Sequence, residues 1–506
     1  MRASLNMLSG FVAGGWSALV GLVALPFYLQ YLGVEAFGLV GFLLTLQAWF
    51  FLLDMGLSPT TSREMARFSG GQHSPQGIRN LFTSLEWVYA LIAVSLALTL
   101  VAGARWLVSD WLQLKSLRPE DAASALSLMA TMVAIQWMAM LYRSAINGLQ
   151  RQVWLGGLTI CFSSLRALAS LAVLAWVSPT LNAFVLVQSA CYLIEAAVMR
   201  WYLDRHLPIE RGRFSMVALK AVWRFAAGIS AITVLATLLN QIDKLLLAKL
   251  LNLEEFGYFS LSMTVIGAMS IIVSPLFNAA YPRLTELSAS GNIKVLSAEY
   301  HAFSQIAAFT ILPIAGTLAV FSSPVVYAWT GDRQLAAYVS PIITAWVVGA
   351  ALNGLLHVPY ALQLAVGWVR LSVVLNVLAV VIMFPALLVL VPRYGAVAAG
   401  WIWAFVNFFH FTVGLFLMHR RLLRKELPRW YFSDLGVPGA AVAGVVTIFW
   451  AAQSGTEPLG RLQSGALIAS TLLAAALTAT LATPSGRRLA IAAVSAAKSR
   501  LASVLQ

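Results

Sequence analysis

Long apolar stretches separated by short polar segments constrain this sequence more than any other feature. Only 10% of the 506 residues are charged and 60% are hydrophobic, whereas about a quarter of the residues in a soluble domain are charged. A helix needs about 20 mostly apolar residues to cross a bilayer, and we find fourteen such stretches. The sequence therefore predicts an all-α polytopic membrane protein with about 14 transmembrane helices.

The predicted spans follow one another with short connections. They lie at about residues 7–30, 37–57, 81–103, 123–148, 155–177, 181–203, 219–241, 256–280, 303–329, 338–363, 369–391, 396–418, 433–453 and 462–482. We expect the first span to be retained, because it is too long for a signal peptide and lacks a clear small-residue cleavage site.

The positive charges of the loops test this arrangement. If the N-terminus is cytoplasmic and the spans alternate, 24 of the 33 lysines and arginines fall in inside segments and 8 in outside segments. Cytoplasmic loops of membrane proteins carry such an excess. A missed or extra span in the middle would invert all later loops and weaken the bias. The count therefore predicts fourteen spans with both termini in the cytoplasm.

A short repeat relates the two halves of the chain. Residues 32–39 follow the first span and residues 251–258 follow the seventh, with Glu, Phe and Gly in register at a constant offset of 219. Six spans separate the two copies, so both halves enter the membrane in the same direction. This pattern indicates a parallel repeat about an axis along the membrane normal, a plan found in transporters.

Composition and motifs exclude several classes of protein. The net charge of +14 does not indicate nucleic-acid binding, because the basic residues sit in separate loops rather than on one face. We find no phosphate-binding glycine loop, metal cluster or nucleophile motif, and neither Cys161 nor Cys191 suggests a metal site or a disulfide. We therefore expect no enzyme activity and no cofactor, with energy drawn from an H⁺ or Na⁺ gradient, the membrane potential or the substrate gradient.

Two arginines are the first candidates for substrate binding. Arg166 lies near the middle of the fifth predicted span, where a charge is costly and usually faces a bundle interior or a water-filled cavity. Its planar fork of donors suits phosphate. The alternative is a structural ion pair with Glu86 or Glu195 on neighbouring helices. Arg143 lies near the inner end of the fourth span, where the alternative is that its side chain reaches to the membrane surface.

Other polar residues in or near the spans complete the candidate set. Glu86 and Glu195 could carry a coupling proton, although structural pairing with an arginine explains each of them equally well. Asn240, Asp243 and Lys244 form a polar cluster at the outer end of the seventh span, where they could line the mouth of a substrate cavity. Anchoring at the interface is the alternative for this cluster.

Several short segments together resemble the polysaccharide-transporter family of lipid-linked oligosaccharide flippases, the Wzx-type O-antigen translocases of the MOP (multidrug/oligosaccharidyl-lipid/polysaccharide) superfamily. The resemblance covers most of the first twelve spans. Its carriers are Leu32-Gly33 with Glu35-Ala36-Phe37-Gly38, Leu53-Asp54-Met55-Gly56-Leu57 with Arg63, Gly148-Leu149-Gln150-Arg151, Asn240 with Asp243, Glu254 with Phe256-Gly257-Tyr258, and Pro392-Arg393-Tyr394-Gly395-Ala396.

The resemblance implies two six-helix bundles in a V, related by a pseudo-twofold axis as in multidrug exporters of the superfamily. On this basis we expect the first bundle at 1–215, the second at 216–420, two extra helices at 421–483 and a basic cytoplasmic tail at 484–506. The implied cargo is an undecaprenyl-diphosphate-linked oligosaccharide, moved from the cytoplasmic to the periplasmic leaflet of a bacterial inner membrane.

The resemblance also suggests partners and leaves alternatives. Membrane lipids, a polysaccharide polymerase and chain-length proteins are the expected partners. A lipid II flippase or a cation-coupled small-molecule exporter of the same superfamily are alternatives, although the first span lacks the arginine-rich start of lipid II flippases. A membrane scaffold or polymerase subunit is the alternative from another class. The longest outside loop, at about 104–122, is too short to favour a polymerase.

Overall fold

Nearly all of the described chain is helical. The computed structural model describes residues 2–54, 56–208, 212–220, 222, 241–267, 269–368, 370–454, 458–492 and 495. These residues divide into two compact units, Met1–Ser260 and Leu261–Gln506, and the division falls within one helix. Each unit is described by itself below.

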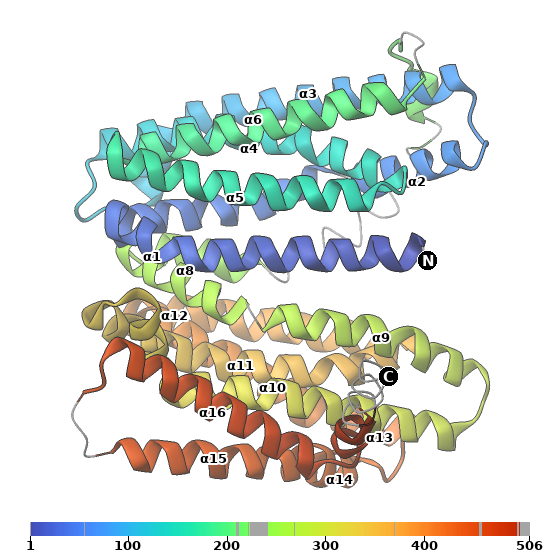
Figure 1. Ribbon diagram of the computed structural model, residues 1–506, viewed down its shortest axis with the longest axis vertical. Helices are drawn as coiled ribbons and strands as arrows, with labels where there is room; N and C mark the ends of the chain where they lie inside the picture. Colours follow the sequence, from blue (N-terminus) through green and yellow to red (C-terminus); the bar gives the residue numbers. More distant parts are fainter. Residues whose placement is uncertain are drawn as a thin grey trace, which may run out of the picture. The chain divides into compact units, whose positions relative to one another are not determined.

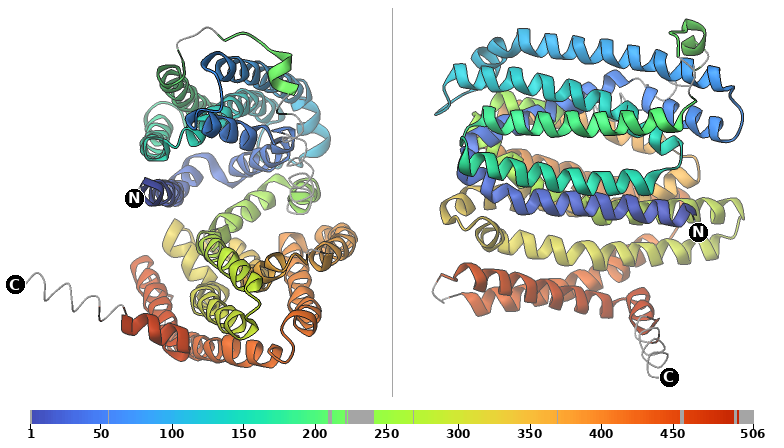
Figure 2. Two further views of the ribbon diagram at one scale, coloured as in Figure 1. Left: turned by 90° about the vertical axis from the view of Figure 1, so that its right-hand side faces the viewer. Right: turned by 45° about the horizontal axis from the view of Figure 1, so that its top comes forward.

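The first unit is a bundle of long helices that run side by side in Figure 1 and appear nearly end-on in the left view of Figure 2. Its elements are α1 (Arg2–Phe50), η1 (Phe51–Asp54), α2 (Leu57–Ser69), α3 (Pro75–Trp106), η2 (Leu107–Trp111), α4 (Pro119–Gly148), α5 (Gln152–Trp176), α6 (Leu181–His206) and the first part of α8 (Leu253–Gly267). Buried residues of α3, α4 and α6 form the largest part of its hydrophobic core. A polar cap starts α3: Ser74 accepts a hydrogen bond from Gly77 N, and Pro75 occupies the first position of the helix, as is typical of helix N-termini.

The second unit is also helical. Its elements are α9 (Ser270–Ala289), α10 (Ile293–Thr330), α11 (Arg333–Ala365), α12 (Arg370–Phe409), η3 (His410–Gly414), α13 (Leu415–Leu422), α14 (Leu427–Arg429), η4 (Trp430–Gly436), α15 (Val437–Gln453) and α16 (Arg461–Ala482). Figure 1 shows α15 and α16 next to each other. Val442 and Val446 of α15 and Ala475 and Ala479 of α16 pack with Phe321 of α10, so the last two helices belong to this unit.

The predicted spans can be followed in the described helices. Among the described residues, ten helices are long and apolar enough to cross a membrane. Two of these ten, α1 and the helix that starts at Arg370, each cover two predicted spans. The eighth predicted span corresponds to the end of α8 and the start of α9. The seventh, 219–241, lies almost wholly outside the described residues.

The two double-length helices each change direction at a glycine. A helix of 49 residues would be about 74 Å long at 1.5 Å per residue, more than twice a bilayer core. Gly33 in α1 has φ +79° and Gly395 in α12 has φ +64°, and neither residue has helical torsion angles. Only glycine adopts this backbone region without strain. The predicted turns between spans are therefore single glycine kinks.

The repeat predicted from the sequence has a counterpart in the packing of the first unit. A Cβ atom added to Gly38 would overlap the carbonyl oxygen of Leu253, and one added to Gly257 would overlap the carbonyl oxygen of Val34. Gly257 is 219 positions after Gly38, and Leu253 is 219 positions after Val34. The two copies thus touch through equivalent atoms in both directions, which is the pattern of a local twofold axis.

The two glutamates of the repeat contact the same loop but in different ways. Glu35 is buried and accepts hydrogen bonds from the backbone N–H groups of Lys115, Ser116 and Leu117 at 2.7–3.0 Å. Glu254 makes a surface ion pair with Lys115 Nζ at 3.2 Å.

This difference predicts unequal effects of substitution. Glu35→Ala should lower the free energy of unfolding by about 2–3 kcal/mol, because several backbone donors lose a charged acceptor. Glu254→Ala should cost less than about 1 kcal/mol, as exposed pairs do. Thermal unfolding of the purified protein in detergent would compare the two. Equal losses would show that the three backbone hydrogen bonds to Glu35 stabilise the fold no more than the exposed ion pair of Glu254 does.

Candidate functional site

Three helices of the first unit bring two arginines to one carboxylate. Arg166 of α5 lies with its Nη1 atom 2.5 Å from Oε2 of Glu195 on α6. Arg143 of α4 makes a short ion pair with the other oxygen, Oε1. We call Arg143, Glu195 and Arg166 the Glu195 bridge. Each carboxylate oxygen of Glu195 accepts from a different guanidinium, which ties α4, α5 and α6 together.

The Glu195 bridge has an excess of one positive charge. The Glu195 side chain is 1% exposed, that of Arg166 14% and that of Arg143 37%. A buried carboxylate is tolerated when it is paired, but one carboxylate neutralises only one of two guanidiniums. The Arg166 guanidinium also lies over the ring of Tyr192, 4.3 Å from its centroid, a cation–π contact that adds some stabilisation. Arg143 is the more exposed of the two arginines, and its guanidinium has further N–H donors that do not contact Glu195.

A second charged cluster joins α3 and α6 and has no such excess. Arg200 Nε lies 2.5 Å from Glu86 Oε1 and also pairs with Asp204. Arg79 Nη2 lies 2.6 Å from the other oxygen of Asp204. Two arginines and two carboxylates give no net charge, so this cluster has the properties of a structural tie. Arg63 and Arg67 also share one buried carboxylate, Glu64 of α2, but their side chains are 45% and 42% exposed. Of these two sites with an excess positive charge in the described first unit, the Glu195 bridge therefore has the more buried arginines.

The structure decides how the predicted charges in the spans are paired. Arg166 pairs with Glu195, and Glu86 pairs with Arg200, so the ion-pair geometry anticipated for these residues is present. That Arg143 shares the same carboxylate was not predicted. Tyr192 was also missed, although it stands three residues before Glu195 and hence on the same face of α6. Ligand contact by Arg166 and Arg143, and ion coupling by Glu86 and Glu195, stay predictions.

The polar cluster at the outer end of the seventh span is only partly visible. Asn240 lies outside the described residues. Asp243 is buried, and Lys244 donates to Gln241 Oε1 at 3.0 Å. Among the described residues, no ion pair or hydrogen bond joins Asp243 or Lys244 to the Glu195 bridge. Their role in substrate binding likewise stays a prediction.

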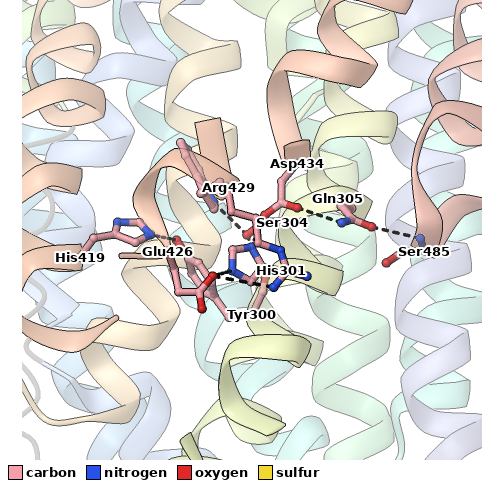
Figure 3. A network of polar contacts seen from close by, with 10 residues as sticks. Tyr300, His301, Ser304, Gln305, His419, Glu426, Arg429, Asp434 and Ser485 are labelled. Atoms are coloured by element: carbon pink, nitrogen blue, oxygen red, sulfur yellow. Dashed lines mark hydrogen bonds and ion pairs between the residues drawn. The ribbon is translucent and has the colours of Figure 1, made fainter. Parts of the chain in front are cut away.

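A buried polar network in the second unit had no counterpart in the sequence-based predictions. Figure 3 shows His301 of α10 between Glu426 and Asp434, with Gln305 between Asp434 and Ser485. His301 Nε2 lies 3.0 Å from Glu426 Oε2, and Nδ1 makes a short contact with Asp434 Oδ2. These residues stand at the edges of predicted spans, where polar side chains are ordinary. Glu426 and Asp434 lie 125 and 133 residues after His301 in the sequence, so no local pattern predicted their contacts.

Comparison with known proteins identifies a family that matches the chain and a relative in Shigella flexneri. The family described as "Polysaccharide biosynthesis protein" matches residues 5–288. A Shigella flexneri protein whose inferred role is O-antigen transport is 19% identical over 387 residues, which are 76% of this chain and 90% of that protein.

Two solved structures show the same fold. The lipid II flippase MurJ in an inward closed conformation has a TM-score of 0.65 at 11% identity, covering 94% of this chain and 98% of its own. An inward-facing multidrug resistance transporter of the MATE family, within the MOP superfamily, has a TM-score of 0.63 at 14% identity, covering 83% and 97%. At such low identity the likeness establishes the fold alone. The predicted polytopic helical fold of the superfamily is thereby confirmed.

Proposed function

The chain belongs to the polysaccharide biosynthesis protein family, and on that premise we propose that it is a flippase for an undecaprenyl-diphosphate-linked oligosaccharide. Family membership confirms the resemblance to polysaccharide transporters noted in the sequence. The proposed cargo is the lipid-linked repeat unit of a surface polysaccharide such as O antigen. The proposed direction is from the cytoplasmic to the periplasmic leaflet of the bacterial inner membrane.

The observation that carries this proposal is the uncompensated positive charge of the Glu195 bridge. A diphosphate is the charged part of such a cargo, and a guanidinium binds phosphate oxygens through paired, charge-assisted hydrogen bonds. In a low-dielectric setting an excess cation strongly favours an anionic ligand. The S. flexneri relative supports the class of cargo, and the loop charges support a cytoplasmic N-terminus and C-terminus.

The proposed mechanism needs binding and release rather than bond-making. Arg143, the more exposed arginine, would meet the diphosphate first, and Arg166 would hold the far side while Glu195 keeps both guanidiniums oriented. Asn240, Asp243 and Lys244 are proposed to contact the cargo near the outer face. An H⁺ or Na⁺ gradient, with Glu195 or Glu86 as the coupling carboxylate, or the cargo gradient itself would supply the energy. A polymerase and chain-length proteins would receive the product.

Replacing Arg166 by glutamine tests the binding role. Glu195 keeps Arg143 as a partner in this variant, so we expect normal abundance. Loss of one charge-assisted contact of about 1.5–3 kcal/mol predicts a tenfold to hundredfold slower translocation. The measurement follows the lipid-linked oligosaccharide in cells that have no other flippase for it. Arg205→Gln is the matched control, because Arg205 is exposed at the end of α6 and stacks on Trp201.

Two outcomes would reject the proposal in different ways. If Arg166→Gln transports at the wild-type rate, Arg166 does not bind the cargo. If deletion of the protein leaves the surface polysaccharide unchanged while lipid II or a small molecule accumulates inside, one of the alternative transport functions replaces the proposed one.

A further inference from the structure

The polar network of the second unit is built around an imidazole with a carboxylate on each side. Both ring nitrogens of His301 are within hydrogen-bond distance of a carboxylate oxygen, from Asp434 on one side and Glu426 on the other. The His301 side chain is 2% exposed, that of Asp434 0% and that of Glu426 31%. We call these three residues the His301 triad. Because each ring nitrogen already faces an oxygen, neither has a free lone pair to offer a metal ion.

Counting protons shows what this arrangement requires. An ionised carboxylate only accepts hydrogen bonds, and a neutral imidazole donates from one nitrogen alone. Two bonds therefore need two protons among the three groups, one more than a neutral histidine with two ionised carboxylates supplies. The count is the same whether the additional proton resides on the ring or on a carboxyl group. Without it, a nitrogen lone pair would face a carboxylate oxygen in a buried place, at a considerable cost.

The surrounding charges lead to the same count. Arg429 pairs with the triad: its Nη1 lies 3.8 Å from the Glu426 oxygen that faces His301. Two carboxylates and one arginine leave one negative charge, which one additional proton cancels. On α10 itself, Gln305 donates to Asp434 Oδ1 at 2.8 Å, and Tyr300 lies 3.3 Å from the ring of His419 on α13. Half-buried Glu426 gives the triad a route to solvent.

The triad also holds the C-terminal helices in place. Asp434 belongs to η4, a π-helical segment just before α15, and such segments are rare and frequently lie at functional sites. Gln305, which donates to Asp434, accepts from the backbone N–H of Ser485 just after α16, at 3.0 Å. At the opposite end of α16, Arg461 donates to the carbonyl oxygens of Ala328 and Trp329. The triad thus adds a polar contact between α10 and the last helices, beside the hydrogen bonds of Arg461 and the apolar packing of Phe321 against α15 and α16.

We propose that the His301 triad is a proton-binding site, loaded in this conformation, that fastens the start of α15 and the end of α16 to α10 and releases them when the proton leaves. The ligand is a single proton taken from the side of the membrane that Glu426 faces. This inference concerns the second unit and does not depend on the identity of the cargo.

Hydrogen exchange of the Ser485 amide tests the proposal in the full-length protein in lipid nanodiscs. The fastened state holds one more proton than the released state, so raising the pH favours release. Between pH 7 and 9, where a released imidazole has lost its proton, and after correction for the intrinsic exchange rate, we expect the opening constant of this amide to rise by up to about tenfold per pH unit, the slope for one proton. Peptides that cover residues 430–436 should follow the same dependence.

Glu426→Gln separates a proton site from a purely structural contact. Glutamine can donate an N–H to the unprotonated ring nitrogen, so both bonds to His301 form without the additional proton. We expect this variant to stay fastened at pH 9 with no pH slope, and to exchange at least tenfold more slowly there than the wild type. His301→Gln should also lose the slope. Glu299→Gln is the control, because Glu299 of α10 pairs with Arg283 at 3.6 Å and should leave the slope unchanged.

The possible results are distinguishable. A wild-type slope in Glu426→Gln, or a wild-type protein whose Ser485 exchange does not depend on pH, would overturn the proposal. A Glu426→Gln protein that is looser at every pH would show that the triad is only a structural contact, and would overturn it as well.

Discussion

Glu195→Ala is expected to lower the free energy of unfolding by about 3–5 kcal/mol, the cost of leaving buried charges without their partner. Two guanidiniums depend on this one carboxylate, and the Arg166 side chain is only 14% exposed. Since membrane proteins that lose this much stability are degraded, the amount of protein in the membrane should fall with it. Thermal unfolding in detergent and quantitative blotting of membranes would measure the two effects.

Asp204 provides a matched control for this prediction. It lies on the same helix and is also shared by two arginines, Arg79 and Arg200, but its side chain is 43% exposed. Arg200 keeps Glu86 as a partner when Asp204 is removed, so Arg79 is the arginine that loses its carboxylate. Because water already reaches Asp204, Asp204→Ala should cost about 1–2 kcal/mol, less than Glu195→Ala. Adding Arg166→Gln to Glu195→Ala should recover part of the lost stability, because one unpaired cation is removed. Equal losses of stability for Glu195→Ala and Asp204→Ala would show that the burial of Glu195 does not raise the cost of removing its carboxylate.

Gly38→Ala is expected to cost about 2–3 kcal/mol, in the upper range for overpacking a close contact. The added methyl group would overlap the backbone carbonyl of Leu253, which cannot rotate away as a side chain would. Gly257→Ala should have a similar cost, because Gly257 meets Val34 in the equivalent way. Thermal unfolding of the three proteins gives the comparison.

Gly21→Ala is the control for this prediction. Gly21 lies in the same helix α1, and an added Cβ would meet nothing within 4 Å. Alanine is the better helix former by about 0.8–1 kcal/mol, so this variant should be as stable as the wild type or slightly more. If Gly38→Ala were as stable as Gly21→Ala, the close contact between Gly38 and the carbonyl oxygen of Leu253 would be contradicted.

The fold was largely predictable because a bilayer sets the length and polarity of each span. The double-length helices were missed, since a single glycine kink such as Gly33 takes the place of a turn without any polar loop. The pairing of Arg166 was foreseen as an alternative, because a charge in a span needs a partner. Arg143 shares Glu195 because of the way α4, α5 and α6 are rotated about their axes. The sequence does not reveal this rotation, because each helix has similar apolar residues on several faces. The His301 triad joins residues of ordinary polarity that are far apart in the sequence, so no local pattern pointed to it.

The bond between Gln305 and Ser485 has a consequence for how the protein is made. It joins residues 180 positions apart, so the second unit cannot complete this contact until Ser485 has left the ribosome. Until then the amide oxygen of Gln305 lacks the backbone N–H of Ser485. A chain that stops before Ser485 would be inserted with this part of the second unit unfinished, in the kind of incompletely packed state that exposes a new protein to degradation.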